Sequence, residues 1–399
     1  MKKALLGTTA LVAAGLAVGD AYAADGVKLS IGGRYMGAAG VIFGEKSDDP
    51  GLEDNTRNYV FKQDVEVYFL GETTLDNGLT VGARVELEGQ TSGDQIDAVY
   101  AYFSGGFGEI RFGDTSEALG QMCYLVPSAS AIFGADSPNF NFSNAGLNSF
   151  GPTNGTCYGV DDKSTKLVYF SPNFGGFSFA ASFTPDASED TRNTFHGAGT
   201  RLKHDGTNDG PNSENISAAL NYTHDFNGVH LVVGGAGTWS LQRETNGVSA
   251  AFHNNTDKRQ EYNGYAQVGF SGFTIGGAVS SRVNRGNAGE DDLVYGAGIT
   301  YNWDAWTVGF GWTHGDYELI GNGAVTGTKK AAGGTITAVT RATADTGEKQ
   351  DIFAITASYA LGPGIQVDGV LEYDDAQIDE GNLDAWKGFS IGLGTLINF

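Results

Sequence analysis

The 399-residue sequence has few basic residues and lacks long apolar runs, and each shortage excludes a class of protein. Lys and Arg total 24 against 47 Asp and Glu, so a net charge of −23 argues against a nucleic-acid partner. After Ala23 no run of 18 apolar residues occurs, which excludes membrane-spanning helices. Proline is also scarce, at 8 residues, whereas glycine reaches 61, an abundance that suits turns, bulges and crowded strands.

Catalytic and metal-binding signatures are missing as well. The six histidines are scattered, and no cluster with cysteine or carboxylate has the spacing of metal ligands. No Gly-x-Ser-x-Gly motif stands out, and nothing marks a Ser and His pair on neighbouring strands. We therefore expect neither an enzyme nor a resident cofactor.

The N-terminus has the three parts of a secretory signal peptide. Lys2 and Lys3 give the positive start, the segment 4–19 is apolar and small, and Ala21-Tyr22-Ala23 fits the small-x-small cleavage pattern. We predict a signal peptide at 1–23 and a mature chain at 24–399. Because cleavage removes two lysines and Asp20, the mature chain would carry −24 rather than −23.

Apolar and polar residues alternate with the period of two that β-strands require, and helical periodicity is weak throughout. Val27, Leu29 and Ile31 begin this pattern, and segment 79–88 repeats it after the hairpin turn at 76–78. About sixteen strands follow, with short turns and long loops alternating, as in outer-membrane barrels. We therefore predict an all-β fold, a 16-stranded antiparallel transmembrane β-barrel with an inward-folded constriction loop.

Alternation alone does not separate such a barrel from a soluble sandwich, so the composition of the two faces decides. The apolar face carries almost no charge, whereas the other face is polar and would line a water-filled lumen. A mean hydropathy of −0.20 agrees with that lumen. Aromatic residues gather beside the short turns, as in an interfacial girdle: Phe107, Phe174, Phe177, Phe226, Phe270, Phe273, Trp303, Trp306 and Phe399.

Three motifs resemble those of the Gram-negative general-diffusion porins, most closely the alphaproteobacterial type. They lie at 66–80, at 105–113 and at 169–177, and the terminal Phe399 is similar to the assembly signal of that family. The pattern covers nearly all of 24–399. The resemblance implies a homotrimer of barrels in the outer membrane of a Gram-negative bacterium. Segment 89–94 is very short for the loop that latches some porin trimers, so a latch is not expected.

The resemblance also implies that the third external loop, here about 114–164, folds inward as the constriction. Porins usually set acidic loop residues against a basic cluster on the wall, which would create a transverse field across the pore. The alternative is that the charges pair along the wall, Arg84 with Glu66 and Glu86. The wall bases are Arg34, Lys62, Arg84 and Arg111, and the loop acids are Asp114, Glu117, Asp136, Asp161 and Asp162.

Two further expectations concern the loops. Cys123 and Cys157 both fall in the expected constriction loop, and we predict that they form a disulfide that stiffens it; two free thiols are the alternative. Acidic loops such as 45–54 could hold Ca²⁺ or form a solvated acidic face near lipopolysaccharide.

The predicted function is a water-filled channel for passive diffusion of small hydrophilic solutes and ions. Inward carboxylates outnumber inward bases, which predicts a mild cation preference. Two alternatives stay open. A substrate-specific channel of the same fold would need an aromatic track on the inner wall, and a receptor or adhesin would use its long loops without much conductance.

Overall fold

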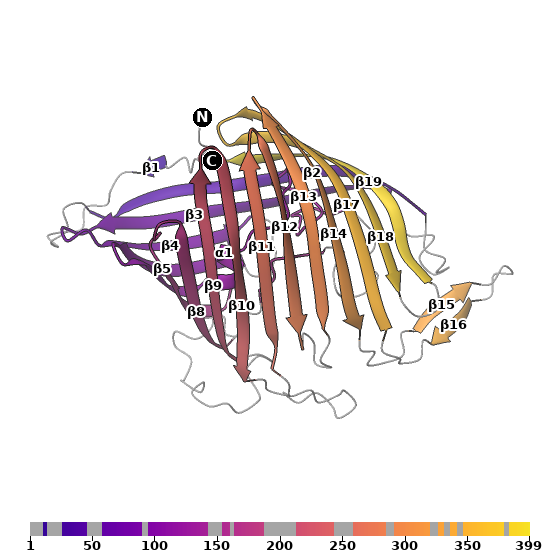
Figure 1. The fold of residues 1–399 in the computed structure, drawn as a ribbon, viewed down its shortest axis with the longest axis horizontal. Helices are drawn as coiled ribbons and strands as arrows, with labels where there is room; N and C mark the ends of the chain where they lie inside the picture. Colours follow the sequence, from indigo (N-terminus) through magenta and orange to yellow (C-terminus); the bar gives the residue numbers. More distant parts are fainter. Residues whose placement is uncertain are drawn as a thin grey trace.

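The computed structural model describes residues 11–13, 26–45, 58–89, 95–142, 154–159, 163–186, 213–242, 258–284, 291–319, 326–330, 336–340, 346–378 and 383–399. Long antiparallel strands curve into a barrel (Figure 1). The elements are β1 Leu11–Ala13, β2 Lys28–Glu45, β3 Tyr59–Thr74, β4 Thr80–Glu88, β5 Ile96–Gly105, β6 Gly108–Asp114, α1 Ala118–Met122, β7 Thr165–Phe170, β8 Phe177–Asp186, β9 Ser213–Phe226, β10 Val229–Gln242, β11 Gln260–Phe270, β12 Phe273–Val283, β13 Asp292–Trp303, β14 Trp306–Leu319, β15 Thr326–Lys330, β16 Ile336–Thr340, β17 Thr346–Gly362, β18 Ile365–Ile378 and β19 Leu383–Asn398.

Sixteen strands, β2 to β14 and β17 to β19, close the barrel. Each pairs with the next in the chain, and the first and last meet through pairs such as Gly392 with Gly40. The predicted 16-stranded antiparallel barrel is confirmed. The short β1 pairs with β2 next to the end of β19, within the stretch expected to be cleaved as a signal peptide. The separate hairpin β15–β16 lies in a stretch for which no strands were predicted.

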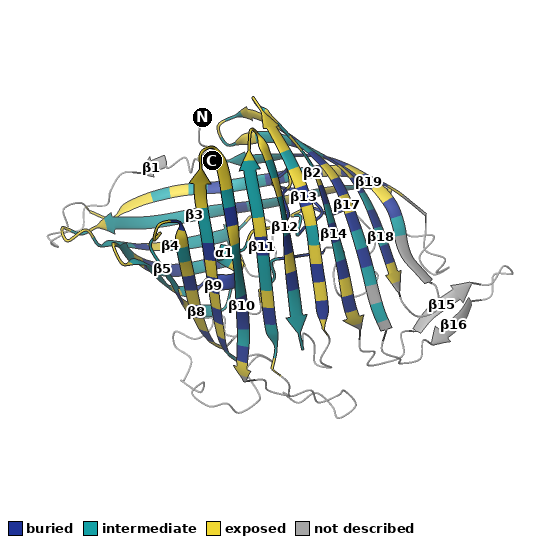
Figure 2. Cartoon of the chain, in the orientation of Figure 1, coloured by how far each residue is buried: buried dark blue, intermediate teal, exposed yellow. Residues whose placement is uncertain are grey.

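Exposed and buried residues alternate along the strands (Figure 2). On β19, exposed Phe389, Ile391 and Leu393 alternate with buried Ser390 and Gly392. Because the exposed positions are large and apolar, they form the surface that faces lipid. Among the described residues, no helix is long and apolar enough to cross a membrane.

The tight turns have the geometry that their residues predicted. Gly78 has a φ of +80°, and the amide of Leu79 donates a hydrogen bond to Asn77 Oδ1 at 3.0 Å. Asn227 and Gly228 both have positive φ in the turn between β9 and β10. These residues tolerate the left-handed region, which lets a two-residue connection reverse the chain.

An apolar core lies inside the barrel, which the sequence did not predict. Ile132 and Phe133 of the third loop pack against inner-wall residues such as Ile352 and Val370. The wall makes room with glycine, since a Cβ on Gly394 would lie 2.5 Å from Ile132 Cδ1. The loop is therefore docked by burial of apolar side chains in the lumen.

Candidate functional site

The constriction loop begins against one side of the lumen. The amide of Ala118, the first residue of α1, donates to Ser182 Oγ of β8 at 3.1 Å, and Leu119 N donates to Ser217 Oγ of β9 at 2.9 Å. Tyr265 of β11 then donates through its hydroxyl to the carbonyl of Met122 at 2.7 Å. Serine and tyrosine side chains on the lumen-facing side of these strands thus hold the first part of the loop.

The remainder of the loop crosses to the opposite strands. Thr313 Oγ1 of β14 donates to the Ala135 carbonyl at 2.6 Å, and Ala129 N donates to Thr356 Oγ1 of β17 at 3.1 Å. Lys62 of β3 donates through Nζ to the carbonyl of Asn141. These contacts run from β8 around to β3, so the loop covers that arc of the inner wall.

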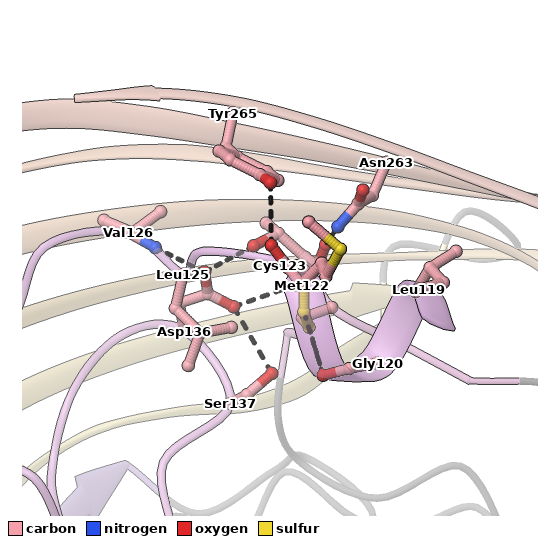
Figure 3. Close-up of a disulfide and its surroundings, with 12 residues drawn as sticks. Leu119, Gly120, Met122, Cys123, Leu125, Val126, Asp136, Ser137, Asn263 and Tyr265 are labelled. Atoms are coloured by element: carbon pink, nitrogen blue, oxygen red, sulfur yellow. Dashed lines mark hydrogen bonds between the residues drawn. A yellow bond between two sulfur atoms is a disulfide. The ribbon is translucent and has the colours of Figure 1, made fainter. Parts of the chain in front are cut away.

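A disulfide joins the two limbs of the loop, as predicted. Cys123 and Cys157 are bonded across a Cα separation of 6.0 Å, directly after α1 (Figure 3). Asp136 connects the same limbs: its carboxylate accepts from Val126 N at 2.8 Å and from Thr156 N at 2.8 Å. Burial raises the pKa of Asp136, and the hydrogen bonds from Thr156 and Val126 offset part of that shift.

Charged side chains concentrate on the inner faces of β2 to β6, which we call the charged wall. Arg34 pairs with Glu66 and lies 3.4 Å from Asp64 Oδ2. On β4, Arg84 Nε lies 2.5 Å from Glu86 Oε1. The charged wall comprises Arg34, Lys62, Arg84 and Arg111 with the carboxylates Asp64, Glu66, Glu72, Glu86, Glu88 and Glu109.

Aromatic rings support these arginines, a feature that the sequence analysis missed. The Arg84 guanidinium lies 4.6 Å from the ring centroid of Tyr68, and Arg111 lies 5.0 Å from Tyr100 and 4.7 Å from Phe170. The sequence did contain a signal for these rings. Each ring lies two residues from charged or small residues, on the strand face that was predicted to line the lumen. Stacking holds each guanidinium in place while the side chains of Arg84 and Arg111 remain 34% and 24% exposed.

The loop carboxylates are placed differently from the prediction of an opposed acidic rim. Asp114, Glu117 and Asp136 are 7%, 1% and 6% exposed. Thr165 Oγ1 donates to Asp114 Oδ1 at 2.5 Å. Asp114 and Asp136 accept hydrogen bonds from nearby hydroxyl and backbone groups, and the carboxylate of Glu117 is buried beside Gly159. Asp161, Asp162 and the acidic segment 46–54 lie outside the described residues.

Acidic and basic groups therefore share one wall among the described residues. Arg111 Nε donates to Glu109 Oε1 at 2.5 Å, and its Nη1 donates to Gln121 Oε1 of the loop at 2.7 Å. Of the four predicted bases, three make ion pairs with neighbouring wall carboxylates. Pairing along the wall, the alternative considered for these charges, is the arrangement observed.

The sequence matches the Gram-negative porin family over residues 7–379. Because this match spans most of the chain, the protein belongs to that family, which implies an outer-membrane location and favours a non-enzymatic channel. No curated protein matches the sequence.

Solved structures share the fold at low sequence identity. The trimer form of OmpT from Vibrio cholerae is 13% identical with a TM-score of 0.55, over 94% of this chain and 100% of that chain. An anion-selective porin from Comamonas acidovorans is 15% identical with a TM-score of 0.55, over 94% and 100%. A mutant of the Rh. blastica porin is 14% identical with a TM-score of 0.51, over 93% and 100%. These likenesses agree with the barrel, and the protein is a porin.

Proposed function

We propose that this porin passes small hydrophilic solutes and ions by passive diffusion along the charged wall, with a mild preference for cations. The cation preference is inferred from the net charge of that wall. Its six carboxylates exceed its four bases, a surplus of two negative charges. A low-dielectric wall with surplus negative charge raises the local concentration of cations.

Single-channel recording of the purified, detergent-folded protein in a planar bilayer tests this proposal. We expect large conductance steps and a reversal potential in a KCl gradient that indicates a modest excess of K⁺ permeability. A reversal potential of the opposite sign would refute the cation preference while leaving the channel itself intact. If the correctly folded barrel shows no conductance, the result would favour a receptor or adhesin.

A substrate-specific channel is the second candidate, because the lumen contains more aromatic side chains than predicted. Tyr68, Tyr100 and Tyr102 all lie on the inner faces of neighbouring strands. Tyr102 donates through its hydroxyl to Glu72, which fixes its ring. A small conductance that one solute blocks at low concentration would favour this candidate over the general pore.

Assembly, lipid contacts and processing belong to the same proposal. The trimer form of V. cholerae OmpT supports a homotrimer, and the exposed apolar faces of the strands suit outer-membrane lipid and lipopolysaccharide. Light scattering of the purified protein tests the trimer, and a monomeric mass would refute it. N-terminal sequencing of protein from outer membranes tests the signal peptide, for which we expect Ala24 as the first residue.

A further inference from the structure

The surface that the constriction loop presents to the lumen is uncharged in the part of the loop that the structure describes. Asp114, Glu117 and Asp136 are all buried. The residues of segment 115–142 that stay exposed are Gly120, Tyr124, Leu125, Ser128, Ala131 and Asn139. The pore therefore has a neutral surface where an acidic rim was expected.

Tyr124 and Leu125 are the two large side chains on this surface, and we call them the apolar lip. They are 37% and 36% exposed. Large apolar side chains usually leave water on folding, and apolar groups that stay exposed in a concave site commonly mark a place where a ligand binds. The exposure of the apolar lip inside a water-filled pore therefore requires an explanation.

Contacts with β11 hold the backbone of the apolar lip in place. Gln267 donates through Nε2 to the Leu125 carbonyl at 2.8 Å, and the hydroxyl of Tyr265 donates to the Met122 carbonyl at 2.7 Å. The rings of Tyr124 and Tyr265 pack with their centroids 5.2 Å apart. The disulfide directly precedes the lip in the chain. Because the backbone is fixed in this way, the two side chains stay exposed in the lumen.

The apolar lip faces the charged wall across the lumen. Sixteen strands close the ring, so the strand opposite β11 is the eighth one along from it, which is β3 of the charged wall. Lys163, near the end of the loop, lies on the side of that wall, since its Nζ is 3.0 Å from Asp97 Oδ2 of β5. A solute in the constriction thus has charged groups on one side and apolar side chains on the other.

The charged wall presents a base beside an acid at the height of the lip. Arg84 lies near the start of β4, and Gln267, which holds Leu125, lies near the end of β11; both strand ends adjoin short turns. Arg84 Nε is 2.5 Å from Glu86 Oε1, and its guanidinium is stacked on Tyr68. A zwitterion carries both charges, so its carboxylate suits the guanidinium and its ammonium group suits the wall carboxylates.

We propose that the apolar lip and the charged wall together favour small amphipathic zwitterions, such as amino acids with an aliphatic side chain, over zwitterions of similar size that are polar throughout. This inference rests on the proposed diffusion function and names its preferred solute class. The charged groups of the solute lie against the wall, and its apolar side chain lies against Tyr124 and Leu125. Because the lip is uncharged, it does not complete the transverse field that would disfavour apolar solutes.

Uptake of labelled leucine and asparagine into proteoliposomes of the purified protein tests the lip, because these amino acids have similar size and the same net charge. At low concentration the initial rate follows the occupancy of the constriction, so the wild type should pass leucine faster than asparagine. Leu125→Asn removes the apolar contact. It should lower the leucine-to-asparagine rate ratio by about twofold or more, less than in a closed pocket because the contact is one-sided.

Leu241→Asn is the matched control, because Leu241 is a leucine of similar exposure, 39%, on the outer face of β10. Its rate ratio should equal that of the wild type. Leu125→Met, which keeps an apolar side chain, should restore the ratio that Leu125→Asn loses. Arg84→Gln should slow leucine and asparagine to a similar extent, since both solutes are zwitterions.

Each variant is first recorded in KCl in a planar bilayer, so that only folded, conducting channels are compared. A folded wild type without conductance would refute the diffusion channel and the inference with it. If the wild type conducts but passes leucine no faster than asparagine, or if Leu125→Asn leaves the ratio unchanged, the inference is wrong while the channel stands. An equal fall in Leu241→Asn would also overturn it. If Leu125→Asn fails to fold, the wild-type ratio alone decides.

Discussion

The ring of Phe142 lies against Gly392, so closely that a Cβ on this glycine would be 2.3 Å from Phe142 Cε2. Gly40, the sheet partner of Gly392 on β2, meets the same ring, with a distance of 2.4 Å to Cδ1. Two paired glycines on β19 and β2 thus form a flat seat for an aromatic side chain of the constriction loop. The adjacent Asn141 accepts from Lys62, which joins this seat to the charged wall.

Replacing this glycine should displace the ring. We expect Gly392→Ala to lower the free energy of unfolding by about 1–3 kcal/mol, the usual effect of overpacking. Because Asn141 adjoins Phe142, single-channel conductance should change as well. Denaturant unfolding and bilayer recording measure the two effects. Gly369→Ala is the control, since its nearest neighbour, the Gly392 carbonyl oxygen, is 3.8 Å away; an equal loss in both variants would refute the seat.

Breaking the disulfide should affect stability more than conductance. Cys123 and Cys157 are 34 residues apart, and releasing a loop of that length should cost about 3–4 kcal/mol in the chain-entropy model. Both limbs are also hydrogen-bonded to the wall, through Met122 on one side and Asn154 on the other, so the open pore should keep its conductance. Alkylation with and without reduction under denaturing conditions gives the bond state by mass. In the double variant Cys123→Ser with Cys157→Ser, denaturant unfolding measures the loss of stability and bilayer recording measures the conductance. A large change in conductance would contradict the prediction.

Neutralising one wall carboxylate should weaken the cation preference. Glu88 lies with Asp64 and Glu66 in a group in which one carboxylate oxygen of each residue is within 4.8 Å of the others. Glu88→Gln reduces the negative surplus of the charged wall by one, so the reversal potential in a KCl gradient should move toward zero. Asp316→Asn is the control, because Asp316 is an exposed carboxylate at an outward position of β14. A shift of equal size in the control would mean that the charged wall does not set the selectivity.

The stability of the loop should depend on pH through Asp136. Burial raises the pKa of this carboxyl above its ordinary value of 3.8, so the folded protein binds a proton more readily than the unfolded chain. Its contribution to stability is therefore greatest in acid and is lost as the pH rises through the raised pKa. Relative to Asp136→Asn, the wild type should lose stability as the pH rises above about 4, the ordinary pKa of this carboxyl. Unfolding of both proteins at several pH values measures this difference, and an increase with pH would contradict it.

The barrel could be predicted from the sequence because its physical cause is local. Each strand must present apolar residues to lipid and polar residues to water, so Phe389, Ile391 and Leu393 define one face without reference to any partner. Asn77 and Gly78 likewise define their turn through φ alone. The approximate range of the constriction loop followed from its place between two such strands, and the cysteine pairing followed from both cysteines falling in that range.

The internal arrangement of the site depended on contacts between residues far apart in the sequence. No local pattern shows that Phe142 packs on Gly40 and Gly392, or that Asp136 bonds to Val126 and Thr156 instead of facing the lumen. The sequence by itself determined the strands, their parity and the charge of the inner face. Only the tertiary structure decided which charges pair and which oxygens are buried together, because closing the barrel and docking the loop bring groups from distant strands within hydrogen-bonding distance.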